Sequence, residues 1–193
     1  MKMKGLIASV IGALMIGCTL TGCGTEISRT VNAAESNNFI AIVGNHAGSL
    51  KPTYSTSKNA VMDACKAEGT VAVIVADGDP YLATGNYIDI PKQQNNLSSS
   101  KLKQIYTSQT EQIMNLMESS YAQTEEVDLL KAIDLCAREA QSSQFSSGKT
   151  EIYIYDAGVS TVYLNMTMMD LEYIDADSIV ATLEDKNMIP DLS

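Results

Sequence analysis

The sequence is poor in the residue types on which catalysis and nucleic-acid binding depend. It has one histidine in 193 residues, no tryptophan, and neither a Gly-x-Ser-x-Gly motif nor a glycine-rich loop with lysine. A histidine-activated nucleophile and a nucleotide site are therefore not predicted, and His46 is interpreted as a loop residue. Lysine and arginine number 13 against 23 aspartates and glutamates. Because basic side chains supply most nucleic-acid affinity, this balance excludes a nucleic-acid partner.

The residues that are present are typical of one soluble acidic domain with an appendage. Hydrophobic residues make up 45% of the chain, charged residues 19%, and the formal charge is -10. A domain of this size buries roughly 70% of the surface that its unfolded chain exposes. We therefore expect it to fold without disulfides or structural metals.

The appendage is the N-terminal segment, which has the architecture of a signal peptide. Lys2 and Lys4 precede an uncharged, mostly apolar run over residues 5–17. At about 1.5 Å per residue this run spans roughly 20 Å, which is short of the roughly 30 Å hydrocarbon core of a bilayer. We therefore expect residues 1–22 to be a signal peptide and not a permanent membrane span.

The apolar run is followed by Leu20-Thr21-Gly22-Cys23, which resembles the lipobox of bacterial lipoproteins. The resemblance implies cleavage before Cys23 and a diacylglycerol, with acyl chains such as palmitate, on its thiol. Two alternatives are Met15-Ile16-Gly17-Cys18 as the box and an ordinary secretory cleavage at residues 31–34. The first has a bulkier residue before its glycine, and the second lies far beyond the apolar run. The expected location is the extracytoplasmic face of a bacterial cell membrane.

Residues 23–38 are polar and lack periodicity, so we expect a lipidated, flexible tether that precedes a folded domain over residues 39–193. Two cysteines, Cys65 and Cys136, remain in that domain. Both lie on the apolar faces of predicted helices, which favours two buried thiols over a disulfide. With one histidine and no Cys-x-x-Cys pair, a cysteine-based metal site is not supported.

Apolar runs and helical periodicity alternate along the domain. Short runs with β-branched residues predict strands buried on both faces over Phe39–Gly44, Thr70–Ala76 and Glu151–Tyr155. Helices are predicted over Ser57–Glu68, ended by Gly69, over Ser98–Ser142 in two pieces, and over Asp177–Lys186 with Asp175 as its cap. This order predicts an α/β fold, a Rossmann-like three-layer sandwich with a mostly parallel central sheet and helices on both faces. The proline- and serine-containing stretch Asp79–Ser100 is expected to be a mobile, exposed loop.

Polar side chains follow each predicted strand, at the edge where ligands bind in open α/β sheets. They include three carboxylates and three hydroxyls, from Asp77, Asp79, Asp156, Ser49, Ser160 and Thr161. Hard oxygen ligands of this kind suit Mg²⁺ or Ca²⁺, the one cofactor hypothesis that the sequence offers. The alternative is ordinary turn chemistry, in which aspartate accepts hydrogen bonds from the following amides and glycine adopts positive φ.

Several short motifs together resemble the von Willebrand factor type A-like domain of bacterial envelope proteins. They are the Val-Gly-Asn that closes the first strand, Asp77–Pro80, Tyr155–Thr161, Leu183 and Ile189–Ser193. The resemblance spans residues 39–193 and implies a mostly parallel sheet flanked by helices. Many members also carry a metal ion adhesion site, Asp-x-Ser-x-Ser, after the first strand. Asn45, Ala47 and Ser49 occupy those positions here, so one carboxylate and one hydroxyl of that set are missing.

In such domains the Ile189–Ser193 stretch resembles the approach to a further strand, so the domain is expected to be truncated, completed by another chain, or a shorter variant. Three hypotheses for function follow. The first is a non-catalytic, lipid-anchored module of the cell envelope that binds a protein or cell-wall ligand and meets the membrane through Cys23. The second is a metal-assisted hydrolase that uses the strand-end aspartates. The third is a fragment or subunit whose fold is completed by a partner chain.

Overall fold

The computed structural model describes residues 36–46, 50–93, 97–145, 148–156, 160–162 and 175–189. The predicted signal peptide, the lipid site at Cys23 and nearly all of the tether lie outside these residues, as does Ser49. Within the described part, no helix is both long and apolar enough to cross a bilayer.

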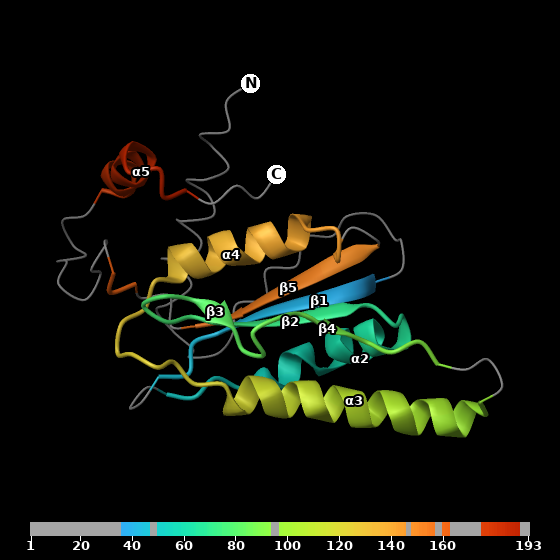
Figure 1. Cartoon of the computed structure of the whole chain (residues 1–193). Coiled ribbons are helices and arrows are strands. Elements are labelled where there is room, and N and C mark those ends of the chain that lie inside the picture. Colours follow the sequence, from blue (N-terminus) through green and yellow to red (C-terminus); the bar gives the residue numbers. More distant parts are fainter. Residues whose placement is uncertain are drawn as a thin grey trace.

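The chain has an α/β fold with a mixed, mostly parallel sheet of five strands (Figure 1). Three parallel strands form its centre: β1 (Ser36–Val43) pairs with β2 (Thr70–Val75) on one side and with β5 (Lys149–Tyr155) on the other. Two short strands, β3 (Tyr81–Leu82) and β4 (Ile88–Asp89), pair antiparallel with the outer side of β2. The three predicted strands are therefore confirmed, together with their mostly parallel arrangement.

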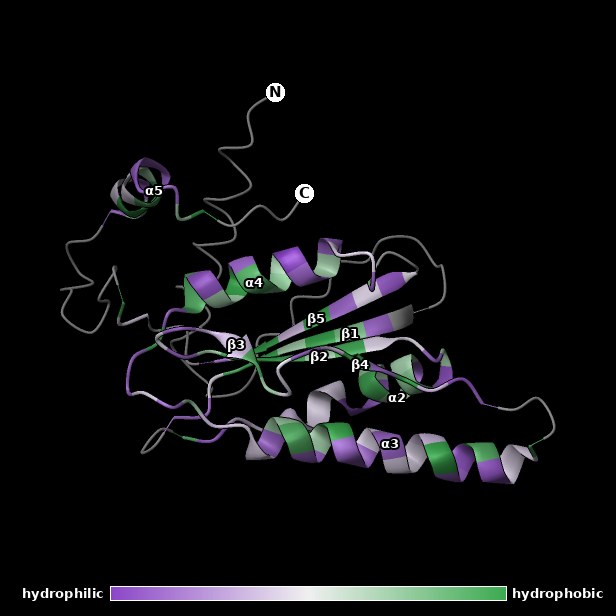
Figure 2. Cartoon of the chain, in the orientation of Figure 1, coloured by the Kyte–Doolittle hydropathy of each residue, from purple (hydrophilic) through white to green (hydrophobic). Residues whose placement is uncertain are grey.

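Helices cover both faces of this sheet and make the molecule three layers thick (Figure 1). On one face lie α2 (Lys58–Lys66), preceded by the short 3-10 helix η2 (Tyr54–Ser57), and α3 (Ser99–Ser119); on the other lies α4 (Leu129–Gln141). Hydrophobic residues predominate in β1 and β2, whereas β5 begins with hydrophilic residues (Figure 2). A fourth described helix, α5 (Ala176–Asp185), is capped by the Asp175 side chain, as predicted.

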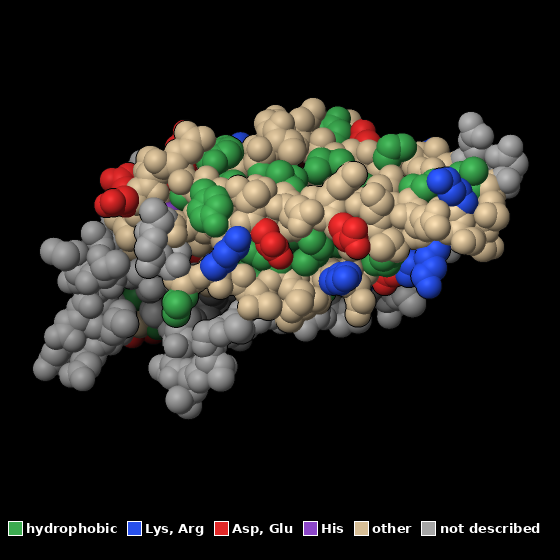
Figure 3. All heavy atoms as spheres, turned by 90° about the horizontal axis from the view of Figure 1, so that it is seen from below, with side chains coloured by type: hydrophobic (Ala, Val, Ile, Leu, Met, Phe, Trp, Pro, Cys, Tyr) green, Lys and Arg blue, Asp and Glu red, His purple; other side chains and the backbone are tan. Residues whose placement is uncertain are grey.

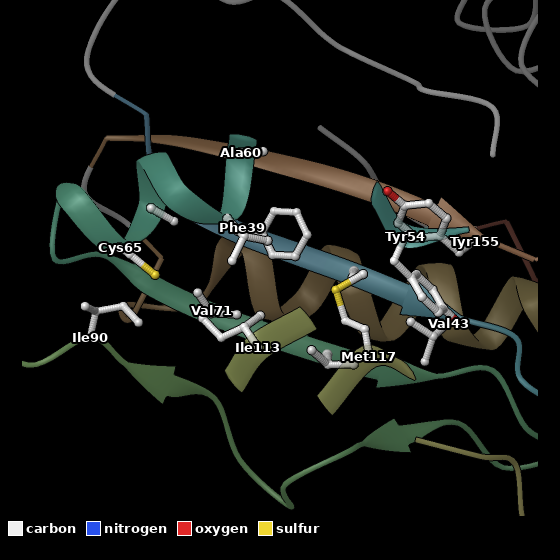
Figure 4. Packing of buried hydrophobic residues seen from close by; sticks show 14 of the residues in the cluster. Phe39, Val43, Tyr54, Ala60, Cys65, Val71, Ile90, Ile113, Met117 and Tyr155 are labelled. Atoms are coloured by element: carbon white, nitrogen blue, oxygen red, sulfur yellow. The ribbon is translucent and has the colours of Figure 1, made fainter. Parts of the chain in front are cut away.

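Alternation along the central strands divides the core into two layers. Phe39, Ala41 and Val43 of β1 pack toward α2 and α3, whereas Ile40 and Ile42 pack toward α4. Figure 4 shows the first layer, where side chains of α2 and α3 meet those of β1 and β2. All these β1 residues are fully buried, which explains why the strand reads as a continuous apolar run.

Two predictions about local structure were wrong. The stretch Asp79–Ser100 contains β3 and β4, and Ile90 within it is buried, so it is not simply an exposed loop. Strands of two residues are too short to produce a period in the sequence. The end of α2 has Glu68, not Gly69, in the left-handed conformation, with φ of 54°. The Gly69 amide still closes the helix by donating to the Ala64 carbonyl.

The two cysteines are buried, free thiols, as predicted. Cys65 lies in the core layer under α2 and Cys136 in the layer under α4, so the sheet separates them. Burial raises the pKa of both thiols, that of Cys136 to about 12. Neither thiol is therefore in the electropositive, accessible setting of a reactive cysteine.

Candidate functional site

The carboxyl ends of β1, β2 and β5 are the predicted site, and one segment of the chain covers them. This segment, residues 120–128, joins α3 to α4 and is called the crossover segment here. Its backbone is hydrogen-bonded to residues that follow all three parallel strands: Asn45 after β1, Asp77 after β2, and Thr161 beyond β5. The carboxyl edge of the sheet is therefore in contact with the crossover segment after each of the three parallel strands.

Asn45 follows β1 and is 1% exposed. Its amide nitrogen donates to the carbonyls of Met117, at 2.9 Å, and Ser120, at 2.7 Å. Its amide oxygen accepts a 2.5 Å hydrogen bond from the Tyr54 hydroxyl. The last carbonyls of a helix have no intrahelical partner, so Asn45 satisfies two acceptors at the carboxyl end of α3. A carboxylate at this position has no proton to donate to them.

The Tyr54 ring lies against the same end of the sheet. It packs edge-on to the Tyr155 ring, with centroids 4.9 Å apart, and both rings lie near Met117 and Val43 (Figure 4). Burial, more than any charge, raises the pKa of the Tyr54 hydroxyl. This hydroxyl is therefore a neutral donor to Asn45 and has no character of a general base.

Asp77 follows β2 and is 3% exposed. Its carboxylate accepts hydrogen bonds from the Gln123 amide at 2.8 Å, the Thr124 amide at 3.2 Å, the Gly78 amide at 2.7 Å and the Thr124 hydroxyl. Burial alone would raise the pKa of Asp77, but these hydrogen bonds to the charged form outweigh it and hold the pKa below its usual value. Asp77 is thus an ionised anchor for the crossover segment.

The two hydroxyl residues beyond β5 hold the far end of the crossover segment. The Thr161 hydroxyl accepts from the Val127 amide at 2.8 Å, and the Thr161 amide donates back to the Val127 carbonyl at 2.9 Å. The Ser160 hydroxyl donates to the same carbonyl at 3.1 Å. These two of the three predicted hydroxyl ligands therefore bind the backbone of the crossover segment.

The other two predicted carboxylates, Asp79 and Asp156, have different contacts from Asp77. The side chain of Asp79 is 87% exposed and forms a 2.6 Å ion pair with Lys131 of α4. Asp156 lies over Gly44, where an added Cβ would come within 1.9 Å of an Asp156 carboxylate oxygen. Only glycine leaves room for that carboxylate beside the end of β1.

The structure thus brings Asp77, Ser160 and Thr161 to one edge, but it bonds each of them to the crossover segment. Among the described residues, no group of three or more histidine, cysteine, aspartate or glutamate side chains is arranged to hold a metal ion. With Ser49 outside those residues, the Mg²⁺ or Ca²⁺ hypothesis stays a prediction. The alternative of turn chemistry is met only in part at Asp77: the following Gly78 amide donates to it, but its other partners belong to the crossover segment, and Gly78 is not among the described glycines with positive φ.

A groove on the α3 side of the molecule was missed in the sequence. It has a volume of about 600 Å³ and lies between residues 51–58 and α3. Lysines line one wall and glutamates the other, and Figure 3 shows this side of the molecule with basic, acidic and apolar side chains interspersed. No sequence signal predicts it, because its walls are about 60 residues apart in the chain and neither carries a motif.

Comparisons with family models, curated proteins and solved structures found no match to this chain.

Proposed function

We propose that the protein is a lipid-anchored, non-catalytic binding or interaction module on the extracytoplasmic face of a bacterial membrane, with a von Willebrand factor type A-like domain. One observation carries the non-catalytic part: three of the predicted site residues at the carboxyl edge of the sheet, Asp77, Ser160 and Thr161, are hydrogen-bonded to the crossover segment. A metal ligand or general base needs lone pairs that can reach a substrate. The oxygens of Asp77 accept four protein hydrogen bonds instead.

Addition of a divalent cation tests the absence of metal-assisted chemistry. Thermal unfolding of the full chain in a mild detergent is followed with no added metal, with Mg²⁺ and with Ca²⁺. We expect one cooperative transition with the same midpoint in all three samples. Because a ligand that binds the native state stabilises it by mass action, a rise in midpoint with either cation would favour the hydrolase hypothesis instead.

The lipid anchor rests on the lipobox-like Leu20-Thr21-Gly22-Cys23. Removal of residues 1–22 takes away Lys2 and Lys4 and leaves a net charge of about -12. Anionic headgroups repel such a domain, so an acyl anchor and a polar tether would supply its membrane attachment.

Metabolic labelling with radioactive palmitate in a bacterial host tests the anchor. We expect the full chain to incorporate label and Cys23→Ser to lose it, with Cys18→Ser as the matched control that keeps it. Equal labelling of the native chain and Cys23→Ser, or loss of label in Cys18→Ser alone, would refute Cys23 as the lipid site.

A second candidate function is a subunit whose sheet is extended by a strand from a partner chain. The observation that favours it is β5, which pairs only with β1 among the described residues. Unpaired edges of this length are sites of strand addition. The measurement is the unfolding midpoint at two protein concentrations: a midpoint that rises with concentration favours this candidate, and a constant midpoint favours a self-sufficient module.

A further inference from the structure

The groove between residues 51–58 and α3 has walls of opposite charge. Lys51 and Lys58 line one wall; Glu111 and Glu118 line the other, two helical turns apart on α3. The buried Tyr54 and the half-buried Met114 lie between them and give the groove an apolar component. A volume of about 600 Å³ is within the range of sites that hold small ligands or short peptide segments.

The charges of the two walls do not neutralise each other. The ion pairs found among the described residues join Lys66 to Asp63, Lys131 to Asp79, Arg138 to Asp134 and Lys149 to Glu151. None includes a lysine or glutamate of the groove. All four groove charges are on exposed residues, so they are available to a ligand at little desolvation cost.

Two exposed hydrophobic residues neighbour Lys51, which lines the groove. In the part of the chain that the structure describes, two large hydrophobic side chains are exposed: Leu50, at 94%, and Tyr121, at 51%. Leu50 precedes Lys51 in the chain, and the Lys51 ammonium lies 5.5 Å from the centroid of the Tyr121 ring. Single exposed hydrophobic residues are common on protein surfaces, but tyrosine beside a charged groove is typical of a binding hot spot.

We propose that this groove binds a peptide segment that carries an ammonium group, a carboxylate and an apolar side chain. The ammonium would face the glutamates of α3, the carboxylate would face the lysines, and the apolar side chain would pack on Tyr121 and Leu50. A ligand of one charge sign would leave one wall unmatched, and a polyanion is also repelled by the net charge of -10. This inference rests on the proposed function, for which it names the site and the ligand class.

Four capped pentapeptides test the proposal, titrated into the full chain in a mild detergent and followed by calorimetry. Their central sequences are Lys-Leu-Glu, Lys-Leu-Lys, Glu-Leu-Glu and Gln-Leu-Gln. We expect the mixed-charge peptide to bind at least about 10-fold tighter than the other three, and to weaken as salt is raised. Equal affinity for all four peptides, or binding of none, would overturn the proposal.

Variants locate the binding. Lys58→Gln and Glu111→Gln are each expected to weaken the mixed-charge peptide about 2- to 5-fold, and Tyr121→Ala about 10-fold. The controls are Lys101→Gln and Glu125→Gln, made separately; each changes the net charge as much as Lys58→Gln or Glu111→Gln does but lies outside the groove, and each should leave affinity unchanged. Equal loss in the controls would assign the binding to overall charge and refute the groove.

Failure here is distinguishable from failure of the proposed function. A chain that binds no peptide, yet takes up palmitate at Cys23 and unfolds independently of divalent cations, refutes the groove alone. A chain whose midpoint rises with Mg²⁺ or Ca²⁺ refutes a module without a metal site, whatever the peptides do. A cooperative unfolding transition for each variant shows that lost affinity is not lost folding.

Discussion

The carboxyl edge of the sheet and the groove beside α3 carry similar polar residues but use them differently. At the edge, Asn45 and Asp77 are nearly fully buried and bind the crossover segment and the end of α3. In the groove, Lys58 and Glu111 are exposed and belong to none of the ion pairs within the described residues. The edge therefore serves stability, and the groove has charges to offer to a ligand.

This difference shows that residue type at a strand end does not by itself indicate function. A buried polar group must have its hydrogen bonds satisfied, and a helix end and a connecting segment supply partners as readily as a ligand does. The edge and the groove are consequently distinguished by two measurements: stability should respond to substitution at the edge, and binding to substitution in the groove.

The largest effect is expected for Asn45→Asp. The new carboxylate cannot donate to the carbonyls of Met117 and Ser120, which would leave acceptors facing each other in a buried site. We expect the free energy of unfolding in urea to fall by about 3 kcal/mol at neutral pH. Asn86→Asp is the matched control: Asn86 is exposed and uses only its side-chain oxygen, as acceptor from the Tyr87 amide, and Asp keeps that oxygen.

The same variant also tests the metal hypothesis, because it restores the aspartate of the Asp-x-Ser-x-Ser pattern. We expect Mg²⁺ and Ca²⁺ to leave the loss of stability in Asn45→Asp unchanged. Recovery of stability with either cation would mean that the carboxyl edge can hold a metal and therefore does more than stabilise the fold.

Asp77→Ala is expected to have the next largest effect. Removal of the carboxylate leaves the Gln123 and Thr124 amides without their acceptor, while the backbone hydrogen bond from the Asp128 amide to the Asp77 carbonyl remains. We expect a loss of about 2 kcal/mol in the free energy of unfolding. Asp79→Ala, two residues away, should cost no more than about 0.5 kcal/mol, because its ion pair with Lys131 is exposed. Equal losses in the two variants would show that Asp77 does not anchor the segment.

Much of the fold could be predicted from the sequence because its signals are local. The apolar runs that became β1 and β2 and the stripes that became α2 to α5 indicate which residues are buried. The prediction that β5 is also buried on both faces was wrong: it is half-buried except at Tyr155. Two-residue strands such as β3 leave no such period. The end of α2 was predicted at Glu68, two residues beyond Lys66, where the helix ends. Glu68 takes the left-handed conformation, and its carboxylate accepts from the Gln93 amide.

The candidate site was less predictable because its contacts are not local. Placement of Asp77 and Asn45 at strand ends follows from the parallel topology, and the structure has both there. Residues 120–128 also return across this edge, and this path could not be predicted. It depends on contacts between distant residues, such as that of Asn45 with Ser120, 75 positions later in the chain. The groove likewise joins Lys58 to Glu111 across two elements, and no pattern within either element indicates the other.

Acid should weaken the carboxyl edge through Asp77. Hydrogen bonds hold the pKa of Asp77 below the value of about 3.9 expected in the unfolded chain. Its stabilising contribution is therefore complete above about pH 4 and is lost as the pH falls through the lower folded-state pKa. The difference in unfolding free energy between the native chain and Asp77→Asn should be constant near pH 5 and above and shrink below pH 4. As the control, Asn45→Ala removes no titratable group, so its loss of unfolding free energy should not change over that pH range. A difference in unfolding free energy between the native chain and Asp77→Asn that stays constant below pH 4 would refute the role of Asp77 as an ionised anchor.

The smallest effect on stability is expected in the groove, because its charged and apolar side chains are not needed to stabilise the fold. Glu111 and Leu50 are exposed, and Glu111 belongs to no ion pair found in the described part of the chain, so Glu111→Gln and Leu50→Ala should each change the free energy of unfolding by less than about 0.5 kcal/mol. Glu111→Gln should lie on the stabilising side of that range, because it removes one negative charge from a chain of net charge -10. Urea unfolding at low ionic strength, where repulsion is least screened, measures both. A loss above about 1 kcal/mol in either variant would place the groove with the carboxyl edge, as a region whose polar and apolar groups serve the fold, and would leave no side chains in it free for a ligand.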